Sequence, residues 1–455
     1  MEHVDVAIVG GGPAGSSAGK TAASNGAKTV IFEKGVPRSD RKNLGPDSTD
    51  AAGMLDYWLE IMGINPEDVP EEVILQELDQ AEFFGPQESL IIENTGQDAT
   101  YEKLGFTFHR ARFDDWLRSE AETAGADYRV GYSVASVDTT INGNEPRHTI
   151  KLQSGDEIEA QYLILADGPQ RQVTINILDK FLPDTKKASK MLSPPHANHI
   201  AYQEHRRIPS ELFDPNSIKF WWGWIPGETA YPWIFPNDNS IARVGLTMPI
   251  NLDLSTLENR EAYRLLQSDD KRVPNGSVYI RRLLENLYGD EYDIDDDFPI
   301  IEDRGKNKGT ETYPISSTRP IESPVEANIA VTGGAMGGTS AFHEGGDHIA
   351  VSTGKIAGRL AANNQLNEYN KQWKIVAGEE IKRNIAIANI VRGYTPSDWD
   401  RAFRIARRLL DRSGLIEAAT AGLPALQFYL QYKKQKFNLR NGQYVQIRES
   451  DYQYV

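Results

Sequence analysis

The sequence predicts an α/β fold: a discontinuous domain of the Rossmann type, a domain built on an antiparallel β-sheet, and a helical C-terminal domain. Three observations predict it. A β-branched run at 4–9 meets glycines at once, and a helical stretch and the apolar run at 29–32 follow, which is a β-α-β pattern. Segments rich in Trp, Tyr and Pro with strand-like alternation come later. Beyond residue 366 the pattern turns helical.

Later landmarks of the Rossmann-type domain are a helix-like stretch at 112–125, a strand at 162–168 and a strand-glycine-helix passage from 328 to about 362. Amphipathic stretches at 367–391 and 397–417 predict two C-terminal helices, and we expect the polar tail after them to be exposed. The predicted division is 1–60, 100–175 and 320–365 for the Rossmann-type domain, 61–99 and 176–319 for the sheet domain, and 366–455 for the helical domain.

The composition excludes several classes of protein. The 455 residues include 65 acidic and 49 basic side chains, a net charge of −16 that argues against a nucleic-acid-binding surface. The chain has no cysteine, so disulfides, thiolate metal sites and cysteine nucleophiles are excluded. The acidic run at 290–297 lacks the glycine and final glutamate of a calcium loop, and we predict no metal site. Without a signal-like or membrane-spanning apolar segment, we expect a cytoplasmic protein, peripheral at most to a membrane.

The N-terminal glycines form a dinucleotide fingerprint. Gly10, Gly12 and Gly15 make GxGxxG between a predicted strand and a predicted helix, which is the context that gives this motif its specificity. The first glycine permits a tight turn, the second lets the backbone approach a pyrophosphate, and the third allows close helix–strand packing. Glu33 ends the second strand, where a carboxylate accepts hydrogen bonds from a ribose. Ala14 and Lys34 complete the predicted contacts in this region.

Three further motifs follow in order. They are FHRARFDDWL with Arg110, ADG at 166–168, and TGGAMGGTSAFHEGGDHIAVSTGKIAG at 332–358. Over residues 1 to about 362 the chain thereby resembles the flavoproteins that include p-hydroxybenzoate hydroxylase, geranylgeranyl reductases and flavin halogenases. The resemblance implies FAD as the cofactor. It also implies cofactor contacts by Gly45, Arg110, Val134, Asp167, Gly168, Gly333, Gly334, Gly345, Gly346 and Asp347.

The last of these motifs departs from the family pattern at two positions, one of which is Ala341 in place of the usual proline before the turn. Where the family has an aspartate that bonds the ribityl or pyrophosphate part of the flavin, this chain has Gly334. The loss of one hydrogen bond costs about 1 kcal/mol, which loosens an extended cofactor without abolishing its binding. A helix that begins near Asp347 would direct its positive end at the flavin ring and stabilise the reduced form.

The motif YPWIFP at 231–236, followed by VGL at 244–246, resembles the YxWxFP…GxG signature of geranylgeranyl reductases. Strand alternation places Tyr231, Trp233 and Phe235 on one face. The resemblance makes these residues, with Pro236 and Gly245, a substrate surface. It implies an oxidoreductase that hydrogenates isoprenoid C=C bonds of a prenyl lipid or prenylquinone by hydride transfer from reduced flavin. Aromatic rings suit this reaction because their faces stabilise the positive charge that develops on a protonating alkene.

Two other functions remain open. An FAD-dependent aromatic hydroxylase would share the cofactor motifs but would have to react with oxygen, and a non-enzymatic prenyl-lipid-binding protein would share the fold. The proton donor is also open: His343 and Glu344 lie in the glycine-rich turn and are candidates for a proton relay. The electron donor, ferredoxin or NAD(P)H, is not determined by any motif.

A last expectation concerns the membrane. Arg401, Arg404 and Arg408 follow one another at helical spacing, with Phe403 among the apolar residues between them. This segment predicts either contact with anionic head groups at the surface of a membrane or a solvated basic face over an internal apolar one.

Overall fold

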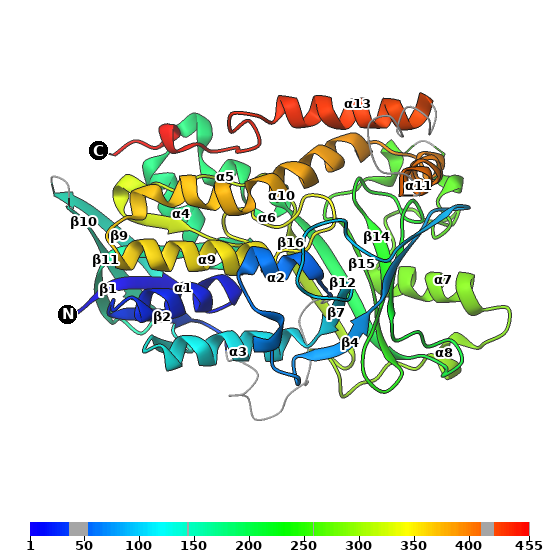
Figure 1. Ribbon diagram of the computed structural model, residues 1–455, viewed down its shortest axis with the longest axis horizontal. Helices are drawn as coiled ribbons and strands as arrows, with labels where there is room; N and C mark the ends of the chain where they lie inside the picture. The colour runs from blue at the N-terminus through cyan, green and yellow to red at the C-terminus, as the bar shows by residue number, and fades with distance from the viewer. Residues whose placement is uncertain (36–52, 143–144, 258, 411–422, 455) are drawn as a thin grey trace.

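The computed structural model describes residues 1–35, 53–142, 145–257, 259–410 and 423–454. It has the α/β fold that the sequence predicts, with two seven-stranded sheets and one three-stranded sheet. One large sheet lies at the left of Figure 1 together with the N-terminus, the other lies at the right, and the three-stranded sheet lies between them.

The first sheet has the order β8-β2-β1-β11-β10-β9, with β17 also paired to β11. The β-branched run of β1 is central because β1 pairs in parallel with both β2 and β11, and its side chains are buried on both faces. Its strands are β1 (Glu2–Val9), β2 (Thr29–Glu33), β8 (Asp127–Val130), β9 (Val134–Asn142), β10 (Glu145–Leu152), β11 (Glu157–Leu165) and β17 (Ile329–Val331).

Two helices from opposite ends of the Rossmann-type domain cross at very short range. These are α1 (Pro13–Ser24) and α9 (Asp347–Ala362), which lie next to each other in Figure 1. A Cβ atom on Gly354 would lie 2.1 Å from the carbonyl oxygen of Ala14, and one on Gly358 would lie 2.0 Å from that of Ala18. The glycines of α9 therefore let the two backbones touch, which brings the N-termini of both helices to the same place.

The second sheet has the order β16-β12-β15-β14-β13-β5-β6 and is antiparallel except for the pair β13–β5. Its strands are β5 (Gln80–Phe84), β6 (Ser89–Ile92), β12 (Asn198–Arg207), β13 (Ser217–Trp221), β14 (Tyr231–Pro236), β15 (Ile241–Pro249) and β16 (Thr310–Ser316). The small sheet consists of β3 (Gly53–Leu55), β7 (Gly105–Phe108) and β4 (Ile74–Leu78). Thr107 of β7 donates a hydrogen bond to the carbonyl of Pro236 and ties the small sheet to β14.

The other helices cover these sheets and form the C-terminal part. They are α2 (Asp56–Met62), α3 (Arg110–Thr123), α4 (Gln172–Phe181), α5 (Ala188–Met191), α6 (Pro194–Ala197), α7 (Gly276–Tyr288), α8 (Ile294–Asp297), α10 (Tyr369–Val391), α11 (Pro396–Leu410) and α13 (Leu423–Asn438). In Figure 1, α10 lies above α9, and α13 lies outermost above α10. Within the described residues, no helix is both long enough and apolar enough to cross a membrane.

The expectation of an exposed C-terminal tail was wrong. Ile447 is fully buried and pairs with Ile321, and the buried Tyr452 donates a hydrogen bond to the carbonyl of Glu322. The backbone N–H of Gln453 donates to the carbonyl of Phe181 at the end of α4. The tail is polar in composition, but its apolar side chains fall at the positions that meet the first domain.

Candidate functional site

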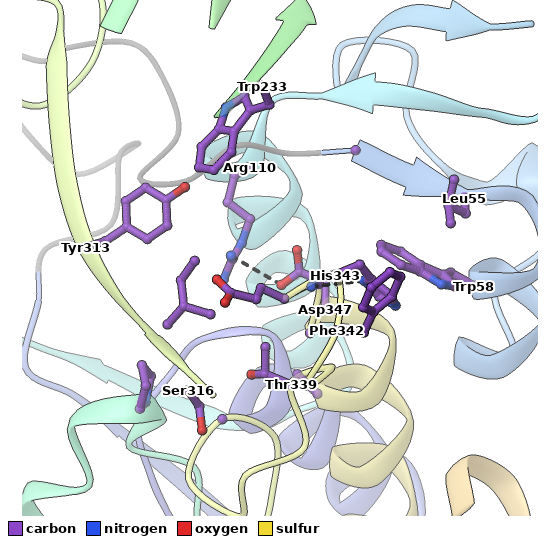
Figure 2. A pocket seen from close by; sticks show the side chains of 18 of the residues that line it. Leu55, Trp58, Arg110, Trp233, Tyr313, Ser316, Thr339, Phe342, His343 and Asp347 are labelled. Carbon is purple, nitrogen blue, oxygen red and sulfur yellow. Dashed lines mark hydrogen bonds and ion pairs between the residues drawn. The ribbon is translucent and has the colours of Figure 1, made fainter. Parts of the chain in front are cut away.

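A cavity of about 510 Å³ lies where the two large sheets meet. Figure 2 shows its wall, with Arg110 reaching toward Asp347 in the middle, Trp233 and Tyr313 on one side, and Trp58 on the other. The wall combines the N-termini of α1 and α9 with the aromatic face of the second sheet. Residues that are more than 200 positions apart in sequence therefore face one space.

At two of the three glycines in the turn an added side chain would collide with the backbone, and at the third it would meet open space. Gly10 has φ +98°, and a Cβ there would lie 2.3 Å from the carbonyl oxygen of Ala166. A Cβ on Gly15 would lie 1.8 Å from the carbonyl oxygen of Gly10. A Cβ on Gly12 would meet nothing within 4 Å, and Gly12 lines the cavity together with Ala14. The turn thus keeps its second glycine facing open space at the start of α1.

The carboxylate of Glu33 lies beside this turn. Its Oε2 accepts a hydrogen bond from the backbone N–H of Gly11 at 2.7 Å, and its Oε1 accepts one from Gly35 at 2.5 Å. Lys34 points away and contacts Gln172. Val134 begins β9 and packs, partly buried, against the core of the first domain, and it does not line the cavity. Gly45 lies outside the described residues.

Arg110 and the start of α9 form the middle of the cavity. Arg110 contacts Asp114 at 2.8 Å and Asp347 at 3.2 Å, and its side chain is 15% exposed. Gly345, Gly346 and Asp347 line the wall, so the positive end of the α9 dipole faces the cavity.

A buried arginine that the sequence analysis missed supports the opposite wall. Arg171 is fully buried and donates hydrogen bonds to the carbonyls of Gly334 and Ala335 and to Asn198. Burial lowers the pKa of Arg171 to about 10, so it stays charged near neutral pH. Its hydrogen bond to Gly334 holds the backbone at the position where the family has an aspartate.

The residues of the neighbouring ADG motif have different roles. Gly168 lines the cavity, but the carboxylate of Asp167 accepts hydrogen bonds from the backbone N–H groups of Val173 and Thr174 at the start of α4. The predicted cofactor contact by Asp167 is therefore corrected, because its oxygens cap a helix. Gly333, with φ +55°, packs against Ala14 and lets the loop turn, and Gly334 lines the cavity.

These features fit an extended dinucleotide. Gly12 leaves open space at the N-terminus of α1, where backbone N–H groups suit a pyrophosphate. From there the cavity continues past Arg110 and Gly168 to the N-terminus of α9. The residues that would hold FAD are thus Gly12, Ala14, Arg110, Gly168, Gly334 and the segment 345–347.

The aromatic wall comes from alternate residues of β14. Tyr231, Trp233 and Phe235 line the cavity and are buried. Gly245 lies directly opposite Trp233 in β15, and a Cβ there would come within 2.5 Å of the indole ring. Gly245 therefore makes room for Trp233 and does not line the cavity itself. Pro236 lines a separate small pocket, so a direct substrate contact by Pro236 is corrected.

His343 lies in the cavity wall, and residues of α10 contact its ring. Its ring stacks on Trp58 with centroids 5.2 Å apart, and its Nδ1 accepts a hydrogen bond from the N–H of Gly345. Its Nε2 lies 3.3 Å from Asn384 and 3.7 Å from Glu380. Burial alone would raise the pKa of Glu380, but the contacts with His343, His348 and Arg383 hold it at about 2. Glu380 is therefore ionised.

Glu344 faces a second set of partners on the other sheet. Its Oε1 lies 2.5 Å from Nδ1 of His199 in β12, and its Oε2 accepts a hydrogen bond from Thr247 in β15 at 2.5 Å. The side chain of Glu344 is 2% exposed, yet the residue lines the cavity. Glu344 also has φ +60°, a left-handed conformation that costs a non-glycine residue about 1–2 kcal/mol. Strain of this kind is typical of functional positions.

Comparisons with known proteins agree with this site. A family model described as an FAD binding domain matches residues 5–145. Digeranylgeranylglycerophospholipid reductase 1 of Methanosphaera stadtmanae is 25% identical over 421 residues, which cover 90% of this chain and 90% of that protein. The chain is thus similar to geranylgeranyl reductases over most of its length, and its N-terminal third matches an FAD-binding domain. It is an enzyme, and FAD is its cofactor.

Solved structures share the fold of this chain. A geranylgeranyl bacteriochlorophyll reductase-like protein from Thermoplasma acidophilum matches with a TM-score of 0.66 and 20% identity, covering 96% of this chain and 98% of that one. A myxobacterial chondrochloren halogenase matches with a TM-score of 0.56 and 17% identity, covering 98% of this chain and all of that one. The same architecture therefore occurs in proteins named for different reactions, and the site residues must decide between them.

Four functional candidates escaped the sequence analysis: Trp58, Arg171, His199 and Glu380. None belongs to a motif, and each reaches the site through tertiary packing. Only Arg171 carried a signal, a charged residue three positions after the ADG turn that follows a buried strand.

Proposed function

We propose that this enzyme hydrogenates C=C bonds in the isoprenoid chain of a prenyl lipid or prenylquinone. The observation that carries the proposal is the shared cavity: one space joins the Gly12 turn and the α9 N-terminus to the aromatic face of β14. A substrate chain held on that face would lie beside the place where Arg110, Gly168 and the segment 345–347 would hold the flavin ring. The reductase names of its relatives support the same substrate class.

FAD in its reduced form supplies the hydride for this reaction. The protein holds the chain in place against Tyr231, Trp233 and Phe235, whose faces stabilise positive charge on the alkene carbon that does not receive the proton. The buried apolar wall excludes water, which strengthens such electrostatic stabilisation. His343 and Glu344 lie in the wall between the aromatic face and α9, where we propose that one of them serves the proton transfer.

Two alternatives have less support. An aromatic hydroxylase binds a compact ring, whereas the lining of this cavity of about 510 Å³ includes Trp58, Phe83 and Phe220, an apolar surface that suits a chain. A non-enzymatic lipid binder would need no ionisable groups in the cavity wall, yet Glu344 is kept there in a strained conformation.

The proposal is tested by anaerobic incubation of the chemically reduced holoenzyme with a panel of prenyl lipids and prenylquinones. We expect a gain of about two mass units for each saturated bond, read by mass spectrometry, without any oxygen consumed. Chemical reduction makes the test independent of whether ferredoxin or NAD(P)H is the natural donor. Oxygen-dependent hydroxylation of an aromatic compound, with every prenyl chain unchanged, would overturn the proposal.

We also propose that the enzyme meets its substrate at a membrane surface through α13. The arginines of α11 suit this role poorly: Arg404 and Arg407 pair with Glu88, Arg401 pairs with Asp398, and Phe403 is buried. In contrast, α13 exposes Leu430 (56%) and Phe437 (63%). The residues from 423 to 448 contain five basic side chains and no acidic one, in a chain of net charge −16. Apolar and basic side chains together favour an anionic lipid interface.

Two matched variants separate the helices. Changing Lys433 and Lys434 to Gln and Leu430 and Phe437 to Ser in α13 is expected to lower binding to vesicles containing phosphatidylglycerol by at least about tenfold, since each surface lysine contributes about 1 kcal/mol. Changing Arg401, Arg404 and Arg408 to Gln in α11 should change it little. Sedimentation with the vesicles measures both. Equal binding by wild type and the α13 variant would exclude α13 as the docking helix.

A further inference from the structure

We propose that His199 and Glu344 share one buried proton and form the proton supply of the site, with His199 recharging Glu344 after each reduction. This inference rests on the proposed function and makes it more specific. Glu344 is the group at the cavity wall, and His199 is a positioning residue that acts through it. In the sequence, Glu344 is one of two candidates for a proton relay, and His199 belongs to no motif.

The geometry follows from strand pairing. His199 lies opposite Ile315 of β16, and Ile315 lines the cavity. Thr247 lies opposite both Ala201 of β12 and Tyr231 of β14. Residues directly opposite each other in a sheet project from the same face. His199 and Thr247 therefore project from the cavity face of the sheet, and Glu344 reaches down to them from the turn before α9.

The pair is connected to solvent on one side only. The side chain of His199 is 14% exposed, whereas that of Glu344 is 2% exposed. A proton can therefore enter at the exposed edge of His199, pass from its Nδ1 to Oε1 of Glu344 across 2.5 Å, and arrive at the cavity wall.

The surrounding charges favour a proton on the pair. Burial would lower the pKa of His199, but the Glu344 carboxylate raises it above its ordinary value, helped by Glu228. Glu228 is itself paired with Arg392. The remaining neighbours are neutral: Thr247 and Thr229 direct their hydroxyls at Glu344, and Tyr231 keeps its proton because burial and Glu344 raise its pKa.

The reaction balances with this arrangement. Bound FAD in its reduced form would supply a hydride, a proton with two electrons, to one alkene carbon. The shared proton, when it is on Glu344, passes to the other carbon, so the C=C bond becomes a single bond. His199, now neutral, takes up a proton from solvent and passes it from Nδ1 to the Glu344 carboxylate, so each cycle consumes one proton from water.

His343 fits the donor role less well because its nitrogens are already engaged. Nδ1 accepts the N–H of Gly345, and Nε2 lies 3.3 Å from Nδ2 of Asn384 and 3.7 Å from Oε1 of Glu380. Both of these partners belong to α10, and the backbone carbonyl of His343 accepts a hydrogen bond from the hydroxyl of Tyr231 in β14. The ring of His343 is thus held by α10, while the carboxylate of Glu344 contacts His199 and Thr247 of the second sheet.

The first test measures the shared proton without any turnover. In the holoenzyme labelled with ¹⁵N-histidine, NMR titration should show His199 protonated to a higher pH than an ordinary histidine, and Glu344→Gln should shift its titration downward by at least one pH unit. His343→Gln is the matched control at the neighbouring position and should leave the His199 titration unchanged. A His199 that is neutral from pH 6 to 9 in the wild type would overturn the proposal.

The second test measures proton delivery in single turnovers of the chemically reduced enzyme with a prenyl lipid. His199→Gln should lower the rate of alkene saturation at least tenfold and raise the solvent deuterium isotope effect, while FAD content and the rate of flavin oxidation by ferricyanide stay as in the wild type. The wild-type rate should fall as the pH rises through the titration of the pair, and this fall should occur at lower pH in the variant. An unchanged rate and pH profile in His199→Gln would overturn the proposal. A wild type that reduces no prenyl lipid would instead refute the proposed function, with the NMR result still deciding whether the proton is shared.

Discussion

Replacing Gly12 with valine is expected to give a folded protein that no longer retains FAD. A Cβ at this position meets no protein atom within 4 Å, and the backbone φ of −71° is open to any residue. The added side chain would instead occupy the space where the pyrophosphate approaches the N-terminus of α1. We expect FAD affinity to fall at least about 100-fold, which corresponds to about 2.7 kcal/mol. The flavin absorbance of the purified protein and titration with FAD measure the effect.

Gly10 provides the contrast within the same turn. Valine at Gly10 would collide with the carbonyl of Ala166 and would have to adopt φ +98°, so it should destabilise the fold itself. In the cofactor-free proteins, the midpoint temperature of thermal unfolding should therefore equal that of the wild type for Gly12→Val and be lower for Gly10→Val. Full FAD content in Gly12→Val would mean that the cofactor does not lie against this turn.

The second large effect is expected at the aromatic wall. Trp233→Ala should keep FAD bound and lower the rate of prenyl reduction at least tenfold, or about 1.4 kcal/mol of transition-state stabilisation, because the indole face is then missing beside the reacting alkene. Single-turnover rates divided by bound FAD give the measurement, so that any loss of folded protein is removed from the comparison.

Trp221 is the matched control. It is buried like Trp233, but it belongs to the core cluster that includes Trp224 and α7 residues and does not line the cavity. We expect Trp221→Ala, like Trp233→Ala, to lower the free energy of unfolding by about 3–5 kcal/mol. Trp221→Ala should leave the rate per bound FAD unchanged. A parallel loss of FAD and of activity in Trp233→Ala would instead make Trp233 a residue of the fold alone.

The sequence predicted those parts of the molecule in which function constrains a local pattern. The turn at Gly10, Gly12 and Gly15 was predictable because backbone geometry at a phosphate requires glycine at fixed spacing. The alternation of Tyr231, Trp233 and Phe235 was predictable because a strand has period two. The start of α9 at Asp347 was also expected, and the structure agrees within the described residues.

The rest depended on tertiary packing. Asp167 was taken for a cofactor ligand because the ADG motif suggests it, but whether its oxygens face a cavity or cap α4 depends on where α4 begins. Arg171 and His199 have no local signature, since they contact Ala335 and Glu344, which lie more than 100 residues away along the chain. The tail after residue 443 looked exposed because the few apolar residues in it meet their partners only in the folded molecule.

That tail also contributes to the first domain. Residues 321 and 322 precede β17 and the turn on the flavin side that follows it. They are held by Ile447, Tyr452 and the backbone N–H of Glu449. Gln453 completes the same attachment at the end of α4. The first domain therefore depends for its final form on contacts with residues 447–453, although its first strand begins at Glu2. A chain truncated near residue 443 is accordingly expected to have a flavin domain that lacks these contacts.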